Sequence, residues 1–456
     1  MGKGSAMGGH VLHVIFLLVI CCAGNGAQID DCTYYGNTST IQNDRCDGEN
    51  NNAMCGLDGG DCCLCTCSHG SHYNCGSNGF TCLDPNVAGV KPSICVKSPS
   101  TLISCPAELQ QEWIVENATQ ARGFANSSRC VGGSFNVTWK GKIVLDETIT
   151  VFEGTVLNVI GGDADAAIVG DGNNRLFAVA NASLHLRNIT VSQGNAMYGG
   201  AIASTSDSRL SFSRVVFSNN TASLGGGAIY LTNASTLTVG EDTDFSNNIA
   251  SDGGALYITS SSAVWGEGKT SFTDNAATSG NGGALYVTKG SSTVWTVTSH
   301  FLSNTAQNDG GVLFLAGHSN ATWNAVSNFT ANDAQRNGGA LLVEEGSRAV
   351  WTEESHFFSN NARDDGGALY VRDGSSVHWT AVSQLVGNSA GNNAGALGLL
   401  NGCSGVWDAT SRFSDNNANR SGGALNVWEA SYVKWTASSN FSSNSAGEDG
   451  GALYLW

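Results

Sequence analysis

The feature that most constrains the fold of this 456-residue chain is a unit of about 28 residues that repeats over its C-terminal part. A pair of small residues ending in glycine recurs at intervals of 27, 27, 29 and then six times 28 residues, and its second residue is Gly200, Gly227, Gly254, Gly283, Gly311, Gly339, Gly367, Gly395, Gly423 or Gly451. Most units also contain a phenylalanine, an asparagine three residues later and an alanine two residues beyond. Seven consecutive units carry a tryptophan: Trp265, Trp295, Trp323, Trp351, Trp379, Trp407 and Trp435. Such units are stable only when they stack on one another.

The unit lacks helical periodicity and is shorter than a propeller blade of about 40–45 residues. It therefore predicts one coil of a parallel β-helix, built from two or three short strands. Alternation then indicates which side chains point inward. In the part of the unit that contains the tryptophan, the position just before it is occupied by His378 in one coil and Lys434 in another. We therefore expect that position to face outward and the tryptophans to face inward. An outward tryptophan ladder, which would offer a platform for sugars, is the alternative.

Stacked coils about 4.8 Å apart place equivalent residues in ladders, including an asparagine ladder whose amides bond along the stack. The same alternation occurs at 142–151, 155–162, 175–180 and 183–191. We therefore expect β-helix coils over 135–456, about thirteen of them in a rod of about 60 Å. Residues 106–134 are expected to cap the N-terminal end, with an amphipathic helix at 109–121.

The last seven residues, GGALYLW, open a further coil that the sequence does not complete. An uncovered coil leaves Leu453 and Leu455 at an edge with unpaired backbone groups, and such an edge promotes association. We therefore expect either a longer protein or end-to-end self-association through this C-terminus.

The first part of the chain has the features of a secreted protein. An apolar run at 11–22 follows Lys3 and precedes small residues, which predicts a signal peptide over 1–27 rather than a short signal anchor. Twelve cysteines remain before the repeats, an even number that favours up to six disulfides in an oxidising compartment over a zinc ribbon: Cys32, Cys46, Cys55, Cys62, Cys63, Cys65, Cys67, Cys75, Cys82, Cys95, Cys105 and Cys130. Cys403 stands alone.

Charge and modification motifs agree with a secreted or cell-surface location. The formal net charge of −17 argues against nucleic acid and anionic membranes as partners. Twelve N-x-S/T sequons are expected to carry N-glycans: Asn37, Asn117, Asn126, Asn136, Asn181, Asn188, Asn219, Asn233, Asn320, Asn328, Asn419 and Asn440.

No residue constellation in the sequence predicts catalysis. An enzyme on this scaffold would need charged residues clustered on adjacent coils. The repeat acids fall just before the glycine pair and alternate with asparagine, which indicates a turn role: Asp252, Asn281, Asp309, Asn337, Asp365, Asn393 and Asp449. The loop acids Asp163, Asp165 and Asp171 and the histidines His300, His318, His356 and His378 form no triad. A variable outward position carries tyrosines expected at a solvated edge: Tyr230, Tyr257, Tyr286, Tyr370 and Tyr454.

The combination of GGAI or GGAL with FSNN, FTDN, FLSN, FTAN or FSSN resembles the polymorphic outer-membrane protein repeat of bacterial autotransporter adhesins. More widely, the array resembles the pectin-lyase-like fold. The resemblance implies an all-β, right-handed, single-stranded parallel β-helix with a role in adhesion.

Residues 43–63, NDRCDGENNNAMCGLDGGDCC, resemble a Notch-type (LNR) repeat, and we assign 28–62 to such a module. The resemblance implies the bridges Cys32–Cys55 and Cys46–Cys62. It also implies a structural calcium ion held by Asn43, Asp58 and Asp61, with Asn51 in support. A plain Asp-Gly-Gly-Asp turn is the alternative. The Cys-rich segment 63–105 is not assigned to a family.

Together these features predict a small disulfide-rich N-terminal domain followed by a glycosylated β-helix. The expected function is non-catalytic adhesion or binding of an extracellular glycan or protein, without a membrane span. The alternative is a polysaccharide-active lyase or epimerase.

Overall fold

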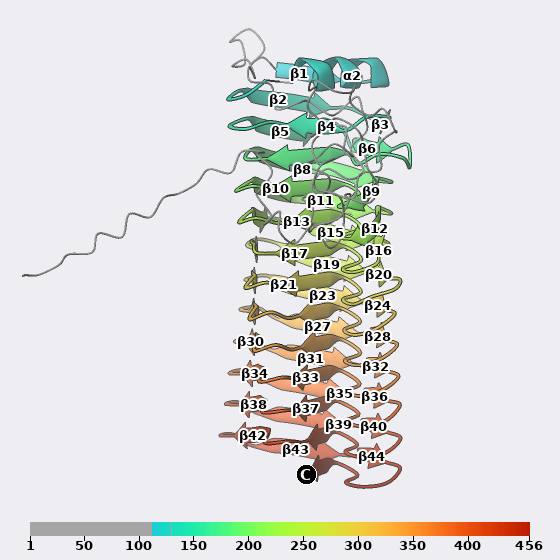
Figure 1. Ribbon diagram of the computed structural model, residues 1–456, viewed down its shortest axis with the longest axis vertical. Helices are drawn as coiled ribbons and strands as arrows, with labels where there is room; N and C mark the ends of the chain where they lie inside the picture. The colour runs from blue at the N-terminus through green and yellow to red at the C-terminus, as the bar shows by residue number, and fades with distance from the viewer. Residues whose placement is uncertain (1–111, 129) are drawn as a thin grey trace, which may run out of the picture. The chain divides into compact units, whose positions relative to one another are not determined.

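The computed structural model describes residues 112–128 and 130–456 (Figure 1). The predictions for the signal peptide, the Notch-like module with its calcium residues and bridges, the segment 63–105 and Asn37 lie outside the described residues. The described part is an all-β parallel β-solenoid of the right-handed type, with about 28 residues per turn. This confirms the fold class expected for the repeats.

A regular coil consists of four short strands, such as β25 (Leu313–Leu315), β26 (Asn320–Trp323), β27 (Ser327–Thr330) and β28 (Asp333–Ala334). Each strand pairs in parallel with its equivalent one coil later, so that Leu313 lies opposite Leu341 and Trp323 opposite Trp351. Four strands replace the expected two or three because the second run of the unit bends between β26 and β27.

The strands form three sheets that run along the stack. Sheet 1 has 23 strands, which are β1 (Glu112–Val115), β2 (Ser134–Trp139), β3 (Lys142–Leu145), β5 (Val156–Gly161), β6 (Ala167–Gly170), β8 (Ser183–Ser192), β11 (Arg209–Ser218), β14 (Thr236–Val239), β15 (Thr243–Ser246), β18 (Ser262–Trp265), β19 (Lys269–Thr273), β22 (Ser292–Trp295), β23 (Thr298–Leu302), β26, β27, β30 (Arg348–Trp351), β31 (Ser355–Phe358), β34 (Ser376–Trp379), β35 (Ser383–Val386), β38 (Ser404–Trp407), β39 (Ser411–Ser414), β42 (Tyr432–Trp435) and β43 (Ser439–Ser442).

Sheet 2 begins each coil after the glycine pair. Its 12 strands are β4 (Ile149–Val151), β7 (Phe177–Ala180), β10 (Ile202–Thr205), β13 (Ile229–Leu231), β17 (Leu256–Thr259), β21 (Leu285–Thr288), β25, β29 (Leu341–Val343), β33 (Leu369–Arg372), β37 (Leu397–Leu400), β41 (Leu425–Val427) and β45 (Leu453–Leu455). Sheet 3 precedes the glycine pair. Its 10 strands are β9 (Asn195–Tyr198), β12 (Thr221–Gly225), β16 (Ile249–Ala250), β20 (Ala276–Ala277), β24 (Thr305–Ala306), β28, β32 (Asn361–Ala362), β36 (Ser389–Ala390), β40 (Asn417–Ala418) and β44 (Ser445–Ala446).

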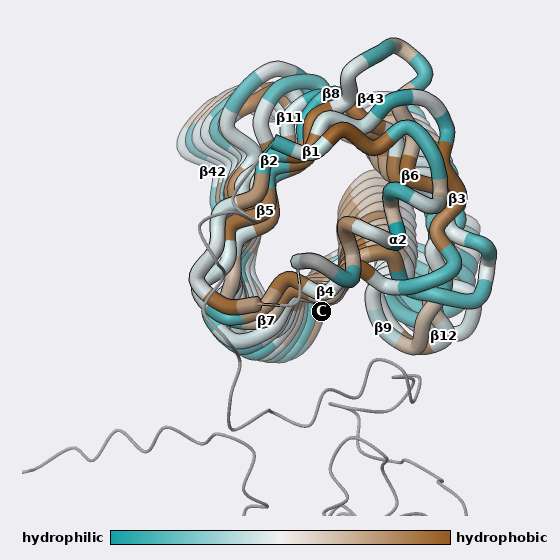
Figure 2. The backbone as a smooth tube through the Cα atoms, turned by 90° about the horizontal axis from the view of Figure 1, so that it is seen from above, coloured by the Kyte–Doolittle hydropathy of each residue, from teal (hydrophilic) through white to brown (hydrophobic). Residues whose placement is uncertain are grey.

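Figure 2 shows the stacked coils end-on, and the three sheets enclose a core of side-chain ladders. The indole rings from Trp265 to Trp435 stack face to face, with centroids 4.5–5.2 Å apart. A phenylalanine ladder meets them edge-on, as Phe357 meets Trp351 at 5.6 Å. The interior position expected for the tryptophans is confirmed, and an outward sugar platform made of them is wrong.

The glycine pair is required for two different reasons. Gly310 has a φ of +67°, in the left-handed region that glycine adopts without strain. Gly311 has an ordinary φ, but a Cβ there would overlap the carbonyl oxygen of Gly339 in the next coil. The first residue therefore makes the turn, and the second allows successive coils to approach.

The N-terminal cap differs from the expectation. The predicted helix at 109–121 is wrong over 112–116, where β1 pairs with β2 because Trp113, Ile114 and Val115 suit a strand. The helix α2 (Ala118–Ser127) begins after Asn117, whose Oδ1 accepts a hydrogen bond from the backbone N–H of Gln120 at 3.0 Å. Within the described ranges no helix is long and apolar enough to cross a membrane.

Candidate binding surfaces

The corner between sheets 1 and 3 is closed by the asparagine ladder that the sequence predicts. The Oδ1 of Asn332 accepts from both the backbone N–H and the side-chain amide of Asn304, at 3.0 and 3.1 Å. The amide of Asn332 in turn donates to the carbonyl of Phe301 at 3.0 Å. Every polar atom of this buried side chain has a partner, and the same pattern repeats from Asn220 to Asn444. These asparagines therefore hold the corner and are not available to a ligand.

The corner between sheets 2 and 1 has a second ladder, of serine hydroxyls. The backbone N–H of Ser291 donates to the hydroxyl of Ser319, and that of Ser319 to Ser347, both at 3.1 Å. Cys403 occupies the serine position of its coil: it is buried, and its thiol donates to the carbonyl of Leu400 at 3.1 Å. The isolated cysteine is thus a ladder residue, and burial raises the pKa of its thiol.

A third ladder explains the alternation of aspartate and asparagine before the glycine pair. The backbone N–H and side-chain amide of Asn337 donate to Asp309 Oδ1 at 3.0 and 2.9 Å, and the N–H of Asp365 donates to Asn337 Oδ1 at 3.2 Å. An asparagine between two aspartates separates their charges by two coils, about 9.6 Å, and donates to one of them. The predicted turn role is confirmed, and the alternation of aspartate and asparagine from Asp252 to Asn393 was the signal for the ladder.

The outward tyrosines of sheet 2 do not lie at a solvated edge, which corrects that expectation. Three of them join Tyr198, at the end of β9 in sheet 3, and Phe314 in an aromatic row, defined as Tyr198, Tyr230, Tyr257, Tyr286 and Phe314, whose successive ring centroids lie 4.6–5.5 Å apart. The row continues into a second apolar cluster outside the main core, made of Phe314, Ala316, Leu342 and Tyr370.

Burial along the aromatic row is graded. Phe314 and Tyr370 are each only 5% exposed, whereas Tyr230, Tyr257 and Tyr286 are half-buried. Burial raises the pKa of Tyr257, and it raises that of Tyr286 to about 12. These phenols therefore remain protonated donors at neutral pH.

The ring faces of the aromatic row are largely occupied by each other. Tyr257 and Tyr286 are within 12° of parallel, and Tyr286 and Phe314 within 18°. Flat stacking of a sugar on these rings is therefore blocked. What the row presents to a ligand is a line of ring edges and phenol hydroxyls.

An ion pair lies on sheet 2 next to this row. Arg372 donates through both Nε and Nη2 to Oε2 of Glu344, which is 8% exposed. Desolvation raises the pKa of Glu344, and the neighbouring guanidinium acts in the opposite direction.

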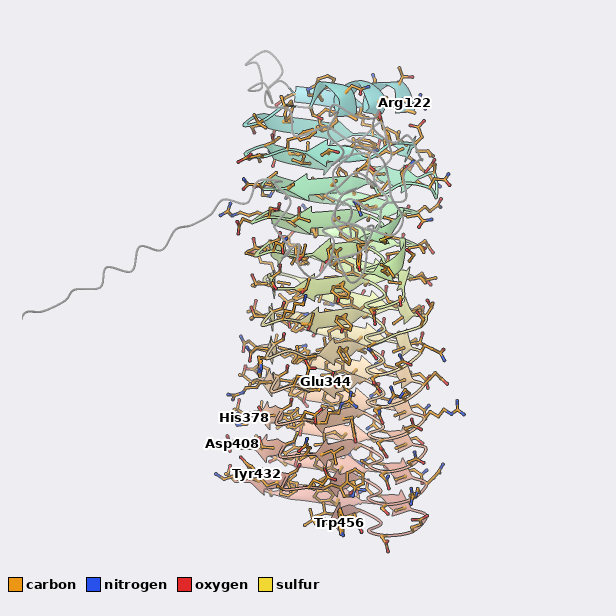
Figure 3. All side chains as sticks on the ribbon, in the orientation of Figure 1. Arg122, Glu344, His378, Asp408, Tyr432 and Trp456 are labelled. Carbon is orange, nitrogen blue, oxygen red and sulfur yellow. The ribbon has the colours of Figure 1, made fainter. Side chains whose placement is uncertain are left out.

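A second polar cluster crosses the outer face of sheet 1 (Figure 3). His378 Nε2 lies 2.7 Å from Asp408 Oδ2, and its Nδ1 lies 3.3 Å from Arg348 Nη2. Asp408 also accepts from the hydroxyl of Thr436 at 2.9 Å. The hydrogen bond from His378 lowers the pKa of Asp408. Both imidazole nitrogens are engaged, so His378 has no nitrogen available to act as a general base.

The other polar groups singled out in the sequence are dispersed. Asp163 accepts from the N–H of Gly141 at 2.9 Å, and Asp171 accepts from the N–H of Asn173 at 2.9 Å, so both serve their loops. His300 contacts Asn328 at 3.4 Å, and His356 pairs with Glu354 at 3.3 Å. No group of three or more His, Cys, Asp or Glu side chains that would hold a metal occurs in the part of the chain that the structure describes.

The sequon asparagines are distributed unevenly over the three sheets. Of the sequon asparagines in the described part, none is buried. Five lie on strands of sheet 1, which are Asn136, Asn188, Asn320, Asn328 and Asn440. No sequon asparagine lies on a described strand of sheet 2 or sheet 3. Asn419, however, directly follows β40 of sheet 3, so a glycan on this sequon would lie beside that sheet.

Comparison with known protein families agrees with this geometry. Four segments of the chain are similar to the Chlamydia polymorphic membrane protein repeat. The model of this repeat (Chlamydia_PMP) matches residues 214–232, 242–259, 269–288 and 438–455. Each match runs from the phenylalanine strand of sheet 1, through the asparagine corner, to sheet 2. No curated protein and no solved structure matched the chain.

Proposed function

We propose that this protein is a non-catalytic, adhesin-like binding protein of a cell surface or extracellular space, built on a rigid β-solenoid. The observation that carries the proposal is that its polar residues have two separate roles. The residues that recur at the corners of the repeat form the three structural ladders, whereas the residues at outward positions differ from coil to coil. A scaffold of this kind presents a long, variable surface without a catalytic constellation in its described residues.

The outer face of sheet 2 is the proposed ligand-binding surface. Its half-buried tyrosines supply phenol donors held in a line, and Thr259 and Thr288 lie two residues beyond Tyr257 and Tyr286 on the same face. Apolar edges together with convergent hydroxyl groups suit a glycan or an uncharged peptide segment.

The repeat match supports a surface location, since the repeat is that of a membrane protein family. Secretion by the signal peptide and N-glycosylation belong to the same proposal. A calcium-stabilised Notch-like module at 28–62, with ligands Asn43, Asn51, Asp58 and Asp61, is proposed on the resemblance alone.

A glycan array combined with an acidic-polysaccharide panel tests the function. We expect the full chain to bind particular ligands without releasing unsaturated uronic acid or epimerising the polymer. Catalytic turnover of any polysaccharide in the panel would overturn the non-catalytic assignment in favour of a lyase or epimerase.

Two substitutions test the surface. Tyr257→Phe keeps the ring packing and removes one hydroxyl, and Tyr257→Ala removes both. We expect stepwise loss of ligand binding in this order. Tyr432→Ala is the matched control, because Tyr432 is 56% exposed on sheet 1 and outside the proposed surface. Equal loss in the control would place binding on sheet 1 instead.

A further inference from the structure

One column of side chains follows the strands of sheet 3, which run along the right-hand side of Figure 1. It contains one residue from each of five consecutive coils, at a constant spacing of 28: Arg336, Asp364, Asn392, Arg420 and Glu448. The backbone N–H of each residue after the first donates to the carbonyl of the one before it, at 2.7–2.8 Å. These bonds keep the column straight, with about 4.8 Å between neighbours.

Three of the four charged side chains in this column are exposed to solvent, and the fourth, Asp364, is half-buried. The side chains of Arg336, Arg420 and Glu448 are 52%, 58% and 55% exposed. Their contacts within the chain are long, 3.7 Å from Arg336 to Asp309 and 3.5 Å from Arg420 to Glu448. The exposed Arg420–Glu448 pair contributes little to stability. Asp309 is buried, with 4% of its side chain exposed, but its contact with Arg336 is long, so the exposed end of Arg336 can also pair with a partner.

The order of charges along the column is positive, negative, neutral, positive, negative. Reversing the column about its centre exchanges the sign at every charged position. A two-fold axis through Asn392, perpendicular to the stack, would therefore bring each Arg336 opposite a Glu448 and each Asp364 opposite an Arg420. Self-complementarity of this kind is what an isologous interface requires.

We propose that two copies of this chain associate side by side and antiparallel through this column, with Asn392 at the two-fold axis. The contact makes four intermolecular ion pairs, two of each kind. It is independent of the ligand-binding surface on sheet 2, and it differs from the end-to-end association expected from Leu453 and Leu455.

The adjacent column is compatible with close approach. It carries Gln335, Arg363, Gly391, Asn419 and Gly447. The same two-fold places Gln335 opposite Gly447, Arg363 opposite Asn419 and Gly391 opposite itself. No like charges meet, and the glycines leave room at the axis and at both ends.

Charge reversal in full-length protein, followed by sedimentation velocity, tests the pairing. Arg336→Glu and Glu448→Arg should each raise the dimer dissociation constant about tenfold, because each creates two like-charge contacts. The double variant should return it close to the wild-type value. Within one chain these positions are four coils, about 19 Å, apart, beyond a direct contact, so only a partner copy couples them.

Matched controls separate this interface from other effects. Arg209→Glu, on sheet 1, should leave the dissociation constant unchanged, and increasing salt should raise it for the wild type. The proposal would be overturned if the effects of the two substitutions on the dissociation constant were additive in the double variant. It would also be overturned if the wild-type chain remained monomeric at high concentration. So would a dimer broken by Leu455→Glu but not by Arg336→Glu.

Asn419 supplies an independent check, because its sequon lies beside Arg420 and its side chain is exposed. An N-glycan at Asn419 would occupy the contact, so the dimer requires this sequon to be unoccupied, whereas the other proposed N-glycans are compatible with it. We expect the unglycosylated chain and its Asn419→Gln variant to dimerise, and chain carrying a glycan at Asn419 to be monomeric. A dimer that persists with this glycan would contradict the assigned interface.

Discussion

The tryptophan ladder allows the sharpest test of the stacking that holds the solenoid together. Trp351 is fully buried, and its ring stacks between those of Trp323 at 4.8 Å and Trp379 at 4.7 Å. It also meets Phe357 edge-on at 5.6 Å. Replacing it with alanine removes both stacked pairs at once.

We expect Trp351→Ala to lower the free energy of unfolding by about 3–5 kcal/mol, the usual range for truncating a buried aromatic residue. The loss should fall in the upper half of that range, because each stacked pair contributes about 0.5–1.5 kcal/mol beyond burial. The indole Nε1 has no hydrogen-bond partner, so no lost hydrogen bond enters the expected value.

Urea denaturation followed by far-UV circular dichroism measures this change. Native-state amide exchange should show faster exchange in β26, β30 and β34, since repeat stability is transmitted between neighbouring coils. Val350→Ala is the control, because Val350 points outward from the same strand, and it should cost about 0.5 kcal/mol. An interior stacked ladder would be refuted if Trp351→Ala lowered the free energy of unfolding by less than about 1 kcal/mol. It would also be refuted if iodide readily quenched the fluorescence of Trp351, measured as the difference between wild-type and variant emission.

The remaining predictions concern single positions. Cys403→Ser should leave the melting temperature unchanged or raise it, because serine restores the hydroxyl ladder; a clear fall in calorimetry would contradict this. Ala331→Gly should stabilise the chain by about 1 kcal/mol, as its φ is +53°, and urea denaturation measures this. Burial raises the pKa of Asp365, so its contribution to stability is complete below the unfolded-state pKa and is lost as pH rises through the folded-state pKa. As the pH rises above about 4, the unfolded-state value, Asp365→Asn should therefore lose less stability than the wild type, and an unchanged pH profile would count against this. Calcium should release heat on titration into the full chain, and less into an Asp58→Ala and Asp61→Ala variant; equal heats would exclude this site.

Much of the fold follows from the sequence because a solenoid is nearly one-dimensional. Each residue meets its own equivalent 28 positions away, so a pattern read along the chain is also the contact pattern. Parity therefore placed Trp351 and Phe357 inside, and the stacking of equivalent residues predicted the hydrogen bonds between Asn304 and Asn332.

The structure of the N-terminal cap could not be predicted in this way, because the cap is not part of the repeat. Residues 109–121 have an amphipathic pattern, but local periodicity does not reveal that β2 offers an edge for Trp113, Ile114 and Val115 to pair with. Pairing with that edge outweighs the helical pattern, and the helix begins only where Asn117 can cap it.

The outer surface likewise depended on tertiary structure. Alternation showed that Tyr257 and Tyr286 point out of the coil, but an outward side chain is buried or exposed according to what packs beside it. Their stacking on each other and the burial of Tyr370 arise from the close spacing of coils and from the neighbouring turn. The sequence by itself determined the repeat, its inward face and its ladders, because those depend on periodicity. Only the tertiary structure decided which outward residues meet one another, because that depends on how each coil bends.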